Sequence, residues 1–347
     1  MKWKSIKTFS SAALVGSVLL AGCGSDEKTP TVSTDPASQQ GTQGSGKLAG
    51  DITVDGSSTV FLITQAVAEE FMKDNADVKI SVGNSGTGGG FKKFVRGETD
   101  ISDASRAIET EEVAEAQKNG VEFIELPIAF DGISVVVNPA NTFATDLTVA
   151  ELNKIWAPES KINNWKDVRA GFPDMKLSLF GPGTASGTFE YFNEAINGDK
   201  KKSRSDYSAS EDDNVLVQGI SGDKGALGYF GYAYLAENAD KIKGVKVNGV
   251  APTPETIRDL SYKPLSRPLF IYVSKKAIET KPAVQAFVKY YLTKGKALVE
   301  TVHYVPFPDK VYELDQKRAD DKKTGSLFSG QKLVGIKFED VLEKEGK

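Results

Sequence analysis

The feature that most constrains the fold is a turn that recurs three times, each time between a predicted strand and a predicted helix. In its fullest form, residues 83–90 read GNSGTGGG and follow a segment in which Val78, Ile80 and Val82 alternate with polar residues. Alternation of this kind indicates a half-buried strand. An amphipathic pattern begins at Phe91. The stretch therefore predicts a strand, a glycine-rich turn and a helix start in succession.

A turn of this composition at a helix start is suited to an anion. The first backbone N–H groups of a helix have no intrahelical partner, and the helix dipole places about half a positive charge there. Glycines allow close approach to the backbone, and Ser85 and Thr87 add hydroxyl donors. Residues 100–106 (DISDASR) follow the predicted helix and bring Ser105 and Arg106 toward the same edge. A glycine-rich turn that binds nothing is the alternative for this stretch alone.

Two common phosphate-binding loops do not fit this turn. The NTPase loop requires GxxxxGK[ST], which the sequence lacks. The dinucleotide-binding pattern GxGxxG fails because Gly86 and Gly88 are followed by Phe91, where the third glycine should stand. Nucleotide binding is therefore not indicated.

Two further turns have the same character. Residues 56–61 (GSSTVF) follow a short predicted strand at 51–54, and residues 181–189 (GPGTASGTF) follow another at 177–180. A simple helix N-cap is the alternative explanation for the hydroxyls at 57–59. Three such turns, after three strands in different parts of the chain, favour convergence on one oxyanion.

The N-terminal residues 1–23 are typical of a bacterial lipoprotein signal. A basic start precedes the apolar residues 12–20, and Leu20-Ala21-Gly22-Cys23 resembles a lipoprotein box, in which the cysteine is lipidated (palmitate) and the chain is cut before it. Cys23 is the sole cysteine, so a lipid anchor on the cell membrane, outside the cytoplasm, is predicted. A plain signal peptide with an incidental cysteine is the alternative. Residues 24–49 are rich in Ser, Thr, Gly, Pro and Gln, which predicts a flexible tether.

A long apolar stretch at residues 121–139 is interrupted by Pro127 and by Asp131-Gly132. We expect two strand pieces there, with a hinge between them. Thr148, followed by Glu151, predicts a capping box at a helix start. Further helices are predicted near residues 282–292 and 338–344.

The rest of the composition excludes several function classes. The formal net charge of −4 argues against nucleic acid. No GxSxG elbow and no Ser-His-Asp order is evident. His303 is the sole histidine, so we expect it to be structural or exposed. For the chain as a whole we expect no metal site, no cofactor and no catalytic residue.

Four segments together resemble a known family. Gly56-Ser57-Ser58-Thr59, residues 85–92 (SGTGGGFK), residues 100–106 and Ser186-Gly187-Thr188, in this order and spacing, are similar to the phosphate-binding protein of the high-affinity phosphate ABC importer. The resemblance covers nearly the whole mature chain, including the lipoprotein start and the return segment at 264–273.

The resemblance implies an α/β, two-lobed periplasmic-binding-protein (type II) fold, with mixed central sheets flanked by helices and two crossing hinge strands. Lobe I would contain residues 50–133 and 268–347, and lobe II residues 134–267. Inorganic phosphate would bind in the cleft, and the partners would be phosphate permease subunits and the membrane, through the N-terminal lipid. The protein would act as a monomer.

Two departures from the family pattern concern charge. The best-known members have an arginine where this chain has Pro182 and an aspartate where it has Ser105. We expect Arg106 to supply the missing charge, because a buried dianion held by neutral donors alone pays a large desolvation cost. For the proton on hydrogen phosphate, Ser105 is the first candidate acceptor, with Asp131 or Asp103 as carboxylate alternatives. The other phosphate-binding positions that the resemblance implies are Ser58, Thr59, Val60 (its amide), Ser85, Ser186, Gly187 and Thr188.

The sequence thus predicts a non-catalytic lipoprotein that captures phosphate and delivers it to a permease. Two alternatives remain at this point. The same fold could carry sulfate, molybdate or a phosphonate, or the chain could be a phosphohydrolase that uses Ser57, Ser58 or Ser186 as nucleophile. No base or metal cluster accompanies those serines.

Overall fold

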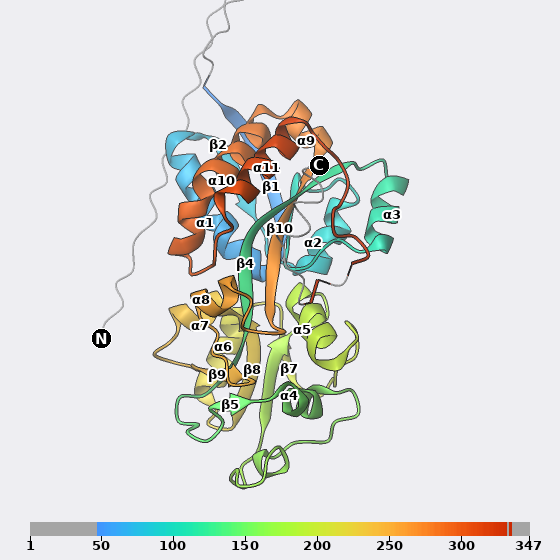
Figure 1. Ribbon diagram of the computed structural model, residues 1–347. Coiled ribbons are helices and arrows are strands. Elements are labelled where there is room, and N and C mark those ends of the chain that lie inside the picture. Colours follow the sequence, from blue (N-terminus) through green and yellow to red (C-terminus); the bar gives the residue numbers. More distant parts are fainter. Residues whose placement is uncertain (1–46, 332, 335–347) are drawn as a thin grey trace, which may run out of the picture. The chain divides into compact units, whose positions relative to one another are not determined.

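The computed structural model describes residues 47–331 and 333–334, in which strands and helices alternate along the chain (Figure 1). The strands are β1 (Ala49–Gly56), β2 (Asp77–Val82), β3 (Ile101–Ala104), β4 (Phe123–Val137), β5 (Asp146–Leu147), β6 (Ser178–Pro182), β7 (Ser208–Ser210), β8 (Ala226–Gly231), β9 (Lys243–Val247) and β10 (Ser266–Ser274). The helices are α1 (Ser58–Asp74), α2 (Thr87–Phe94), α3 (Thr110–Lys118), α4 (Val149–Trp156), α5 (Gly187–Asn197), α6 (Asp213–Gly222), α7 (Tyr232–Glu237), α8 (Pro254–Arg258), α9 (Lys275–Thr280), α10 (Pro282–Thr301) and α11 (Asp309–Asp320), with a short 3-10 turn at Trp165–Asp167.

Several predicted features lie outside the described residues. These are the signal segment, Cys23, most of the tether and the predicted helix at 338–344. Among the helices that the structure describes, none combines the length and the apolar character needed to cross a bilayer.

Strands β4 and β10 connect two groups of strands. The order is β2-β1-β3-β10-β4-β8-β6-β7, with β9 paired to β4 and β5 paired to β9. Strand β1 is parallel to β2 and β3, whereas β10 is antiparallel to both β3 and β4. The far end of β4, from Ile133 to Val137, pairs with β8. The mixed α/β fold predicted from the resemblance is thus confirmed, with β4 and β10 running side by side between the two groups (Figure 1).

The prediction of two strand pieces at 121–139 is wrong, because β4 is one continuous strand in which every residue is buried. Pro127 is accommodated by a register shift between Leu269 and Phe270 of the partner strand. A bulge of this kind lets a strand continue past a residue that has no N–H to donate. Asp131 does not interrupt the strand either, because it pairs with Arg267 of β10.

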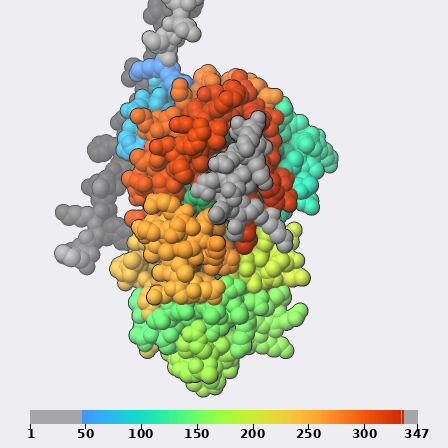
Figure 2. All heavy atoms as spheres, viewed as in Figure 1, coloured from blue at the N-terminus to red at the C-terminus, as the bar shows by residue number. Residues whose placement is uncertain are grey.

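Helices cover each group of strands separately. We call β1–β3 with α1, α2, α3 and α9–α11 the first side, and β5–β9 with α4–α8 the second side. On the first side, α1 packs on β2 and β3, α2 packs on β1 and β3, and α10 packs on α1 and β1. On the second side, α5 packs on β6 and α4, and α6 packs on β6 and β8. Figure 2 shows α10 and α11, in orange and red, at the surface of the first side.

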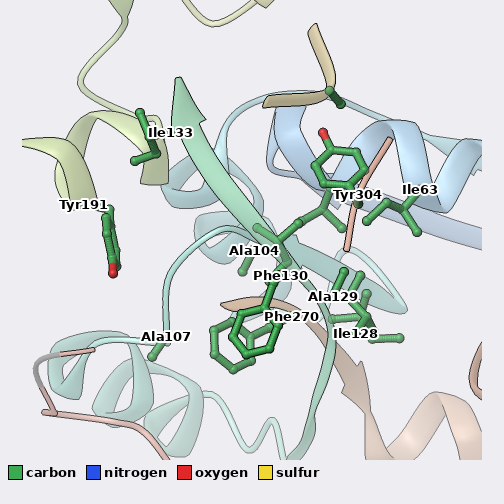
Figure 3. Packing of buried hydrophobic residues seen from close by; sticks show 14 of the residues in the cluster. Ile63, Ala104, Ala107, Ile128, Ala129, Phe130, Ile133, Tyr191, Phe270 and Tyr304 are labelled. Atoms are coloured by element: carbon green, nitrogen blue, oxygen red, sulfur yellow. The ribbon is translucent and has the colours of Figure 1, made fainter. Parts of the chain in front are cut away.

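The core follows the shared strands. Ala129 and Phe130 of β4 lie near Phe270 of β10, with Ile63 of α1 and Tyr304 on the same part of the core (Figure 3). Each of these side chains is at most 4% exposed. Burial of large apolar side chains is the main stabilising term in such a core, at about 25 cal/mol per Å² removed from water. Helix α1, which follows the first predicted turn, is therefore packed on this core through Ile63.

Candidate functional site

The first predicted turn lies between β1 and α1. Ser57 is the N-cap of α1, and its hydroxyl accepts a hydrogen bond from the Val60 N–H at 3.4 Å. The Ser57 N–H donates to the Asp103 carbonyl at 2.9 Å. Gly56 permits this approach, since at its φ of +147° a Cβ would lie 2.1 Å from that carbonyl oxygen. The start of α1 is therefore fixed against the end of β3.

The third predicted turn leads into α5 and also meets the end of β3. Ser186 is the N-cap of α5, and its hydroxyl accepts from the Thr188 N–H at 3.1 Å. A Cβ on Gly187 would lie 2.6 Å from the hydroxyl oxygens of both Ser105 and Thr87. Those two hydroxyls are 3.1 Å apart. Gly187 therefore allows α5 to begin directly against two hydroxyls of the first side.

The second predicted turn, at the start of α2, joins the third turn through the backbone. The Gly88 N–H donates to the Ala185 carbonyl at 2.9 Å. The first and third turns also meet, because the hydroxyl oxygens of Thr59 and Thr188 are 3.2 Å apart. The structure thus brings all three predicted turns together at the starts of α1, α2 and α5.

An arginine that sequence analysis did not single out lies at this junction. Arg267 of β10 is fully buried, and its Nη2 donates to the hydroxyl oxygens of Thr188 at 2.8 Å and Thr59 at 3.2 Å. Its Nη1 donates to the Ser105 carbonyl at 3.2 Å. Its Nε and Nη2 donate to Asp131 Oδ2 at 3.1 and 2.9 Å. We call Thr59, Ser105, Thr188, Asp131 and Arg267 the Arg267 cluster.

The sequence carried a signal for Arg267. It is the one charge within residues 265–273 (LSRPLFIYV), a run of strand formers that is expected to be buried. A buried charge needs a partner, so a functional or paired role was open to inference. The partner itself, Asp131, is set by the register of β10 on β4 and does not follow from the sequence.

A second buried carboxyl adjoins the first turn from the second side. The Ser58 hydroxyl donates to Asp213 Oδ2 at 2.9 Å, and Asp213 is the first residue of α6. Burial raises the pKa of Asp213 to about 7, while the bond from Ser58 and the charge of Arg267 act against that rise. Asp131 and Asp212 add negative charge in the same direction as burial. Asp213 is therefore a carboxyl whose proton is exchanged near neutral pH.

Ser85, a predicted binding residue, is engaged elsewhere. Its hydroxyl and its N–H donate to Asp55 Oδ1 at 2.7 and 3.0 Å. The other oxygen of Asp55 forms an ion pair with Lys93. No hydrogen bond within the described residues joins the Ser85 side chain to the Arg267 cluster.

The structure does not bring Arg106 to the cluster, although Arg106 directly follows Ser105. Its Nη1 and Nη2 each donate to one oxygen of Glu112 at 2.8 Å, and its Nε is ion-paired with Glu190. Nη1 also donates to the Ala107 carbonyl at 3.1 Å. Because each guanidinium nitrogen already has an acceptor, the contacts do not support Arg106 as the charge donor to an anion. Arg267 instead occupies the position beside the converging turns that was expected for Arg106.

The three predicted proton acceptors lie in different environments. Asp131 is paired with Arg267, and burial raises its pKa while Arg267 lowers it. Asp103 accepts from the Thr64 hydroxyl at 3.0 Å, and burial raises its pKa well above the usual range. Ser105 contacts the Thr87 hydroxyl. Of these, Asp131 and Ser105 belong to the Arg267 cluster.

Metal binding has no support in the described part of the chain. Within residues 47–331 and 333–334, no group of three or more His, Cys, Asp or Glu side chains is placed to hold an ion. His303 is exposed, as expected. The Arg267 cluster instead combines a buried guanidinium with hydroxyls at the starts of α1 and α5, which is chemistry suited to an oxyanion.

The structure thus has two groups of strands joined by β4 and β10, and a cluster suited to an anion lies where helix starts from both sides meet. In comparison with known families, the model of the PBP superfamily domain matches residues 37–294. The chain therefore belongs to the PBP superfamily.

The chain is also similar to individual proteins over most of its length. The chain is 49% identical over 302 residues to Protein SphX of Synechococcus elongatus, covering 85% of this chain and 89% of that protein. It is 38% identical over 326 residues to the phosphate-binding protein PstS of Staphylococcus saprophyticus, covering 92% and 95%. Among solved structures, an ABC-type phosphate transport receptor from Vibrio cholerae superposes with a TM-score of 0.58 at 25% identity, covering 74% of this chain and all of that one.

Proposed function

We propose that the protein is a non-catalytic solute-binding protein that captures inorganic phosphate outside the cytoplasm and delivers it to an ABC permease. Relatives named as phosphate-binding and phosphate transport proteins support this ligand. The single observation that carries the proposal is Arg267, a fully buried guanidinium donating to hydroxyls of two converging turns. Hydroxyl oxygens are acceptors that an anion can replace, and a guanidinium can bind two phosphate oxygens at once.

Phosphate would bind among the three helix starts. The hydroxyls of Ser58 and Thr59 and the Val60 amide would act from α1, and Ser186, Gly187 and Thr188 from α5. Ser105 lies between them, and Arg267 replaces Arg106 as the source of charge. This arrangement is supported by the hydrogen bonds that link these turns to one another and to Arg267. Ser85 would contribute only after releasing Asp55, which accepts from both its hydroxyl and its N–H.

Asp213 is our choice for the group that shares the proton of hydrogen phosphate. It is buried, it is bonded to Ser58, and its pKa of about 7 lets one proton be shared with the ligand. A carboxylate acceptor disfavours sulfate, which brings no proton at neutral pH and would leave two anions in contact. Asp131 is the second candidate. It ranks below Asp213 because its carboxylate already forms an ion pair with Arg267.

Capture would involve closure of residues 50–133 with 268–347 onto residues 134–267 about β4 and β10. The ligand would contact both lobes only in the closed state, so it would shift the population toward closure. Thr59, Thr188 and the bond from Gly88 to Ala185 support this, since they join turns of the first and second sides.

The membrane anchor remains part of the proposal, with lipid on Cys23 and a tether after it. Its support is the LAGC sequence. Intact mass of the membrane-extracted protein tests it, and a mature N-terminus other than a lipidated Cys23 would refute it.

Isothermal titration of residues 47–347 with phosphate and with sulfate tests the central function. We expect saturable binding of phosphate and much weaker binding of sulfate. Tight sulfate binding without phosphate binding would replace phosphate by another oxyanion. Absence of binding to either would reject the function.

A further inference from the structure

Arg106 forms an ion-paired bridge between the two sides of the molecule. Its bidentate partner, Glu112, belongs to α3 on the first side, close to Arg106 in the chain. Its other partner, Glu190, belongs to α5 on the second side. The guanidinium also lies over the ring of Phe91 of α2, with 5.2 Å between the guanidinium carbon and the ring centroid. Arg106 is thus held firmly on the first side while it reaches one carboxylate on the second.

The bridge is placed where it can control the Arg267 cluster. Arg106 directly follows Ser105, and Glu190 stands two residues after Thr188 in the first turns of α5. Ser105 and Thr188 both contact Arg267. The approach that pairs Arg106 with Glu190 is therefore the same approach that brings the third turn onto the cluster.

From this geometry we propose that Arg106 and Glu190 form a latch that holds the closed state and so positions the Ser186–Thr188 turn on the ligand. The inference rests on the proposed function, since a latch needs a closing cleft. Arg106 is then a positioning residue that never touches the anion. The latch sets how long phosphate stays bound, and it has no part in the first encounter with phosphate.

Burial distinguishes this pair from a second bridge at the rim. The side chains of Arg106 and Glu190 are only 6% and 11% exposed, whereas those of Lys200 and Glu109, paired at 3.2 Å, are 33% and 21% exposed. Solvent screens the exposed pair more strongly. Opening costs little free energy at Arg106, because Glu112 remains paired with it. Opening also returns the Glu190 carboxylate to water. The latch can therefore form and break without leaving a buried charge alone.

The pair also explains the use of two carboxylates on one arginine. A single partner across the gap would leave the guanidinium unpaired on opening, and an unpaired buried charge is costly. With Glu112 permanently bound on the first side, only the Nε contact to Glu190 has to break. Glu112 is itself fixed, because it accepts from the Glu109 N–H at 2.8 Å in the capping box of α3.

The test measures association and dissociation rates of radiolabelled phosphate for the parent and for Glu190→Ala, Glu190→Gln, Glu112→Gln and Arg106→Lys. For Glu190→Ala we expect dissociation about tenfold faster, with an association rate within about twofold of the parent, because pairs of this kind act mainly on dissociation. Glu190→Gln keeps an oxygen that accepts from Nε and should be intermediate. Arg106→Lys should retain part of the effect, because an ammonium keeps the charge without the fork.

Glu112→Gln is the matched control. It changes the same guanidinium by the same chemistry, but on the first side only. Because Glu112 keeps Arg106 paired when the latch opens, its replacement should leave dissociation no faster than in the parent. Melting temperatures without phosphate separate a latch from a merely structural pair. A structural role would lower the melting temperature of ligand-free Glu190→Ala and leave the dissociation rate of the remaining folded protein unchanged.

These measurements distinguish failure of the latch from failure of the proposed function. If the parent binds phosphate and Glu190→Ala releases it at the parent's rate, the latch is wrong and the proposed function stands. If the parent binds no phosphate, the proposed function fails. Small-angle scattering of the ligand-free proteins then decides the latch, and equal radii of gyration for the parent and Glu190→Ala overturn it.

Discussion

Two buried arginines lie close to the same segment, and only one of them is suited to bind an anion. Arg106 is bound by Glu112 on one side and Glu190 on the other, so its charge is compensated entirely by carboxylates. Arg267 has one carboxylate partner, Asp131, and also donates hydrogen bonds to two hydroxyls and a carbonyl. A hydroxyl can rotate and give way to a ligand oxygen, whereas a carboxylate in a buried ion pair cannot leave without cost. The partners of a buried arginine, more than its position in a motif, therefore indicate its role.

Removal of Arg267 should have the largest effect. Arg267→Ala leaves the anion facing neutral donors and should cost about 2–5 kcal/mol of phosphate binding, the range for loss of one partner of a buried charge pair. Isothermal titration measures this. Because Asp131 would also lose its partner, the double variant Arg267→Ala with Asp131→Asn controls for an unpaired carboxylate. If the double variant binds phosphate like the parent, Arg267 is not the charge donor.

The second prediction concerns pH and the carboxyl that faces Arg267 from the second side. The pKa of Asp213 is raised to about 7, so between about pH 4 and pH 7 the folded protein holds a proton that the unfolded chain releases. The contribution of Asp213 to the free energy of unfolding should therefore fall as pH rises through this window, by about 1.4 kcal/mol per pKa unit of difference. Asp213→Asn should remove this slope and gain stability, relative to the parent, at pH 8.

Denaturant unfolding without phosphate at pH 5 and pH 8 measures that slope. Asp212→Asn is the matched control, because Asp212 is the adjacent N-cap of α6, is exposed, and keeps a capping oxygen as asparagine. Equal pH dependence in the parent and in Asp213→Asn would show that Asp213 is ionised in the folded protein, and the proton-sharing role would be lost with it.

A smaller effect should come from the hydroxyl that Arg267 contacts most closely. Thr188→Val removes the oxygen 2.8 Å from Nη2 and keeps the side-chain shape. We expect a loss of about 1–2 kcal/mol in phosphate affinity, because the variant lacks the hydroxyl that would donate to the ligand. Titration at two salt concentrations should give the same loss, since the site is buried. A loss that disappears at high salt would place Thr188 at an exposed rim.

The smallest effect should come from Ser85, because its hydroxyl, like the Arg106 guanidinium, is already bound by a carboxylate. Its hydroxyl is held by Asp55, which Lys93 neutralises in turn. Ser85→Ala should therefore change phosphate affinity by less than about 0.5 kcal/mol in the same titration. A loss as large as that of Thr188→Val would mean that Ser85 releases Asp55 and binds the ligand, as the family resemblance implies.

Local sequence signals predicted much of the fold. The capping box of Thr148 and Glu151 is present at the start of α4, because cap chemistry depends on residues three positions apart. Ser57 and Ser186 cap α1 and α5, although capping was only the alternative interpretation of the first turn and was not predicted for the third. The break expected at Asp131-Gly132 failed because pairing with β10 overrides the local turn signal.

The site was predicted in part, for a related reason. The three turns could be found because each carries its own composition, and the structure brings them together. The charge of Arg267 within a strand-forming run was a signal, but its contacts with the turns could not be predicted, because they join residues far apart in the chain. Arg106 lies in the DISDASR motif, and Arg267 lies in the return segment at 264–273. Glu190 of α5 pairs with Arg106, whereas Thr188 of the same helix accepts a hydrogen bond from Arg267.

A structure of the protein with phosphate bound would show directly which arginine holds the anion. We expect phosphate oxygens in contact with the Arg267 guanidinium and the Ser186–Thr188 turn, with Arg106 still paired to Glu112 and Glu190. A phosphate held by Arg106, with Glu190 displaced, would contradict the assignment of both arginines.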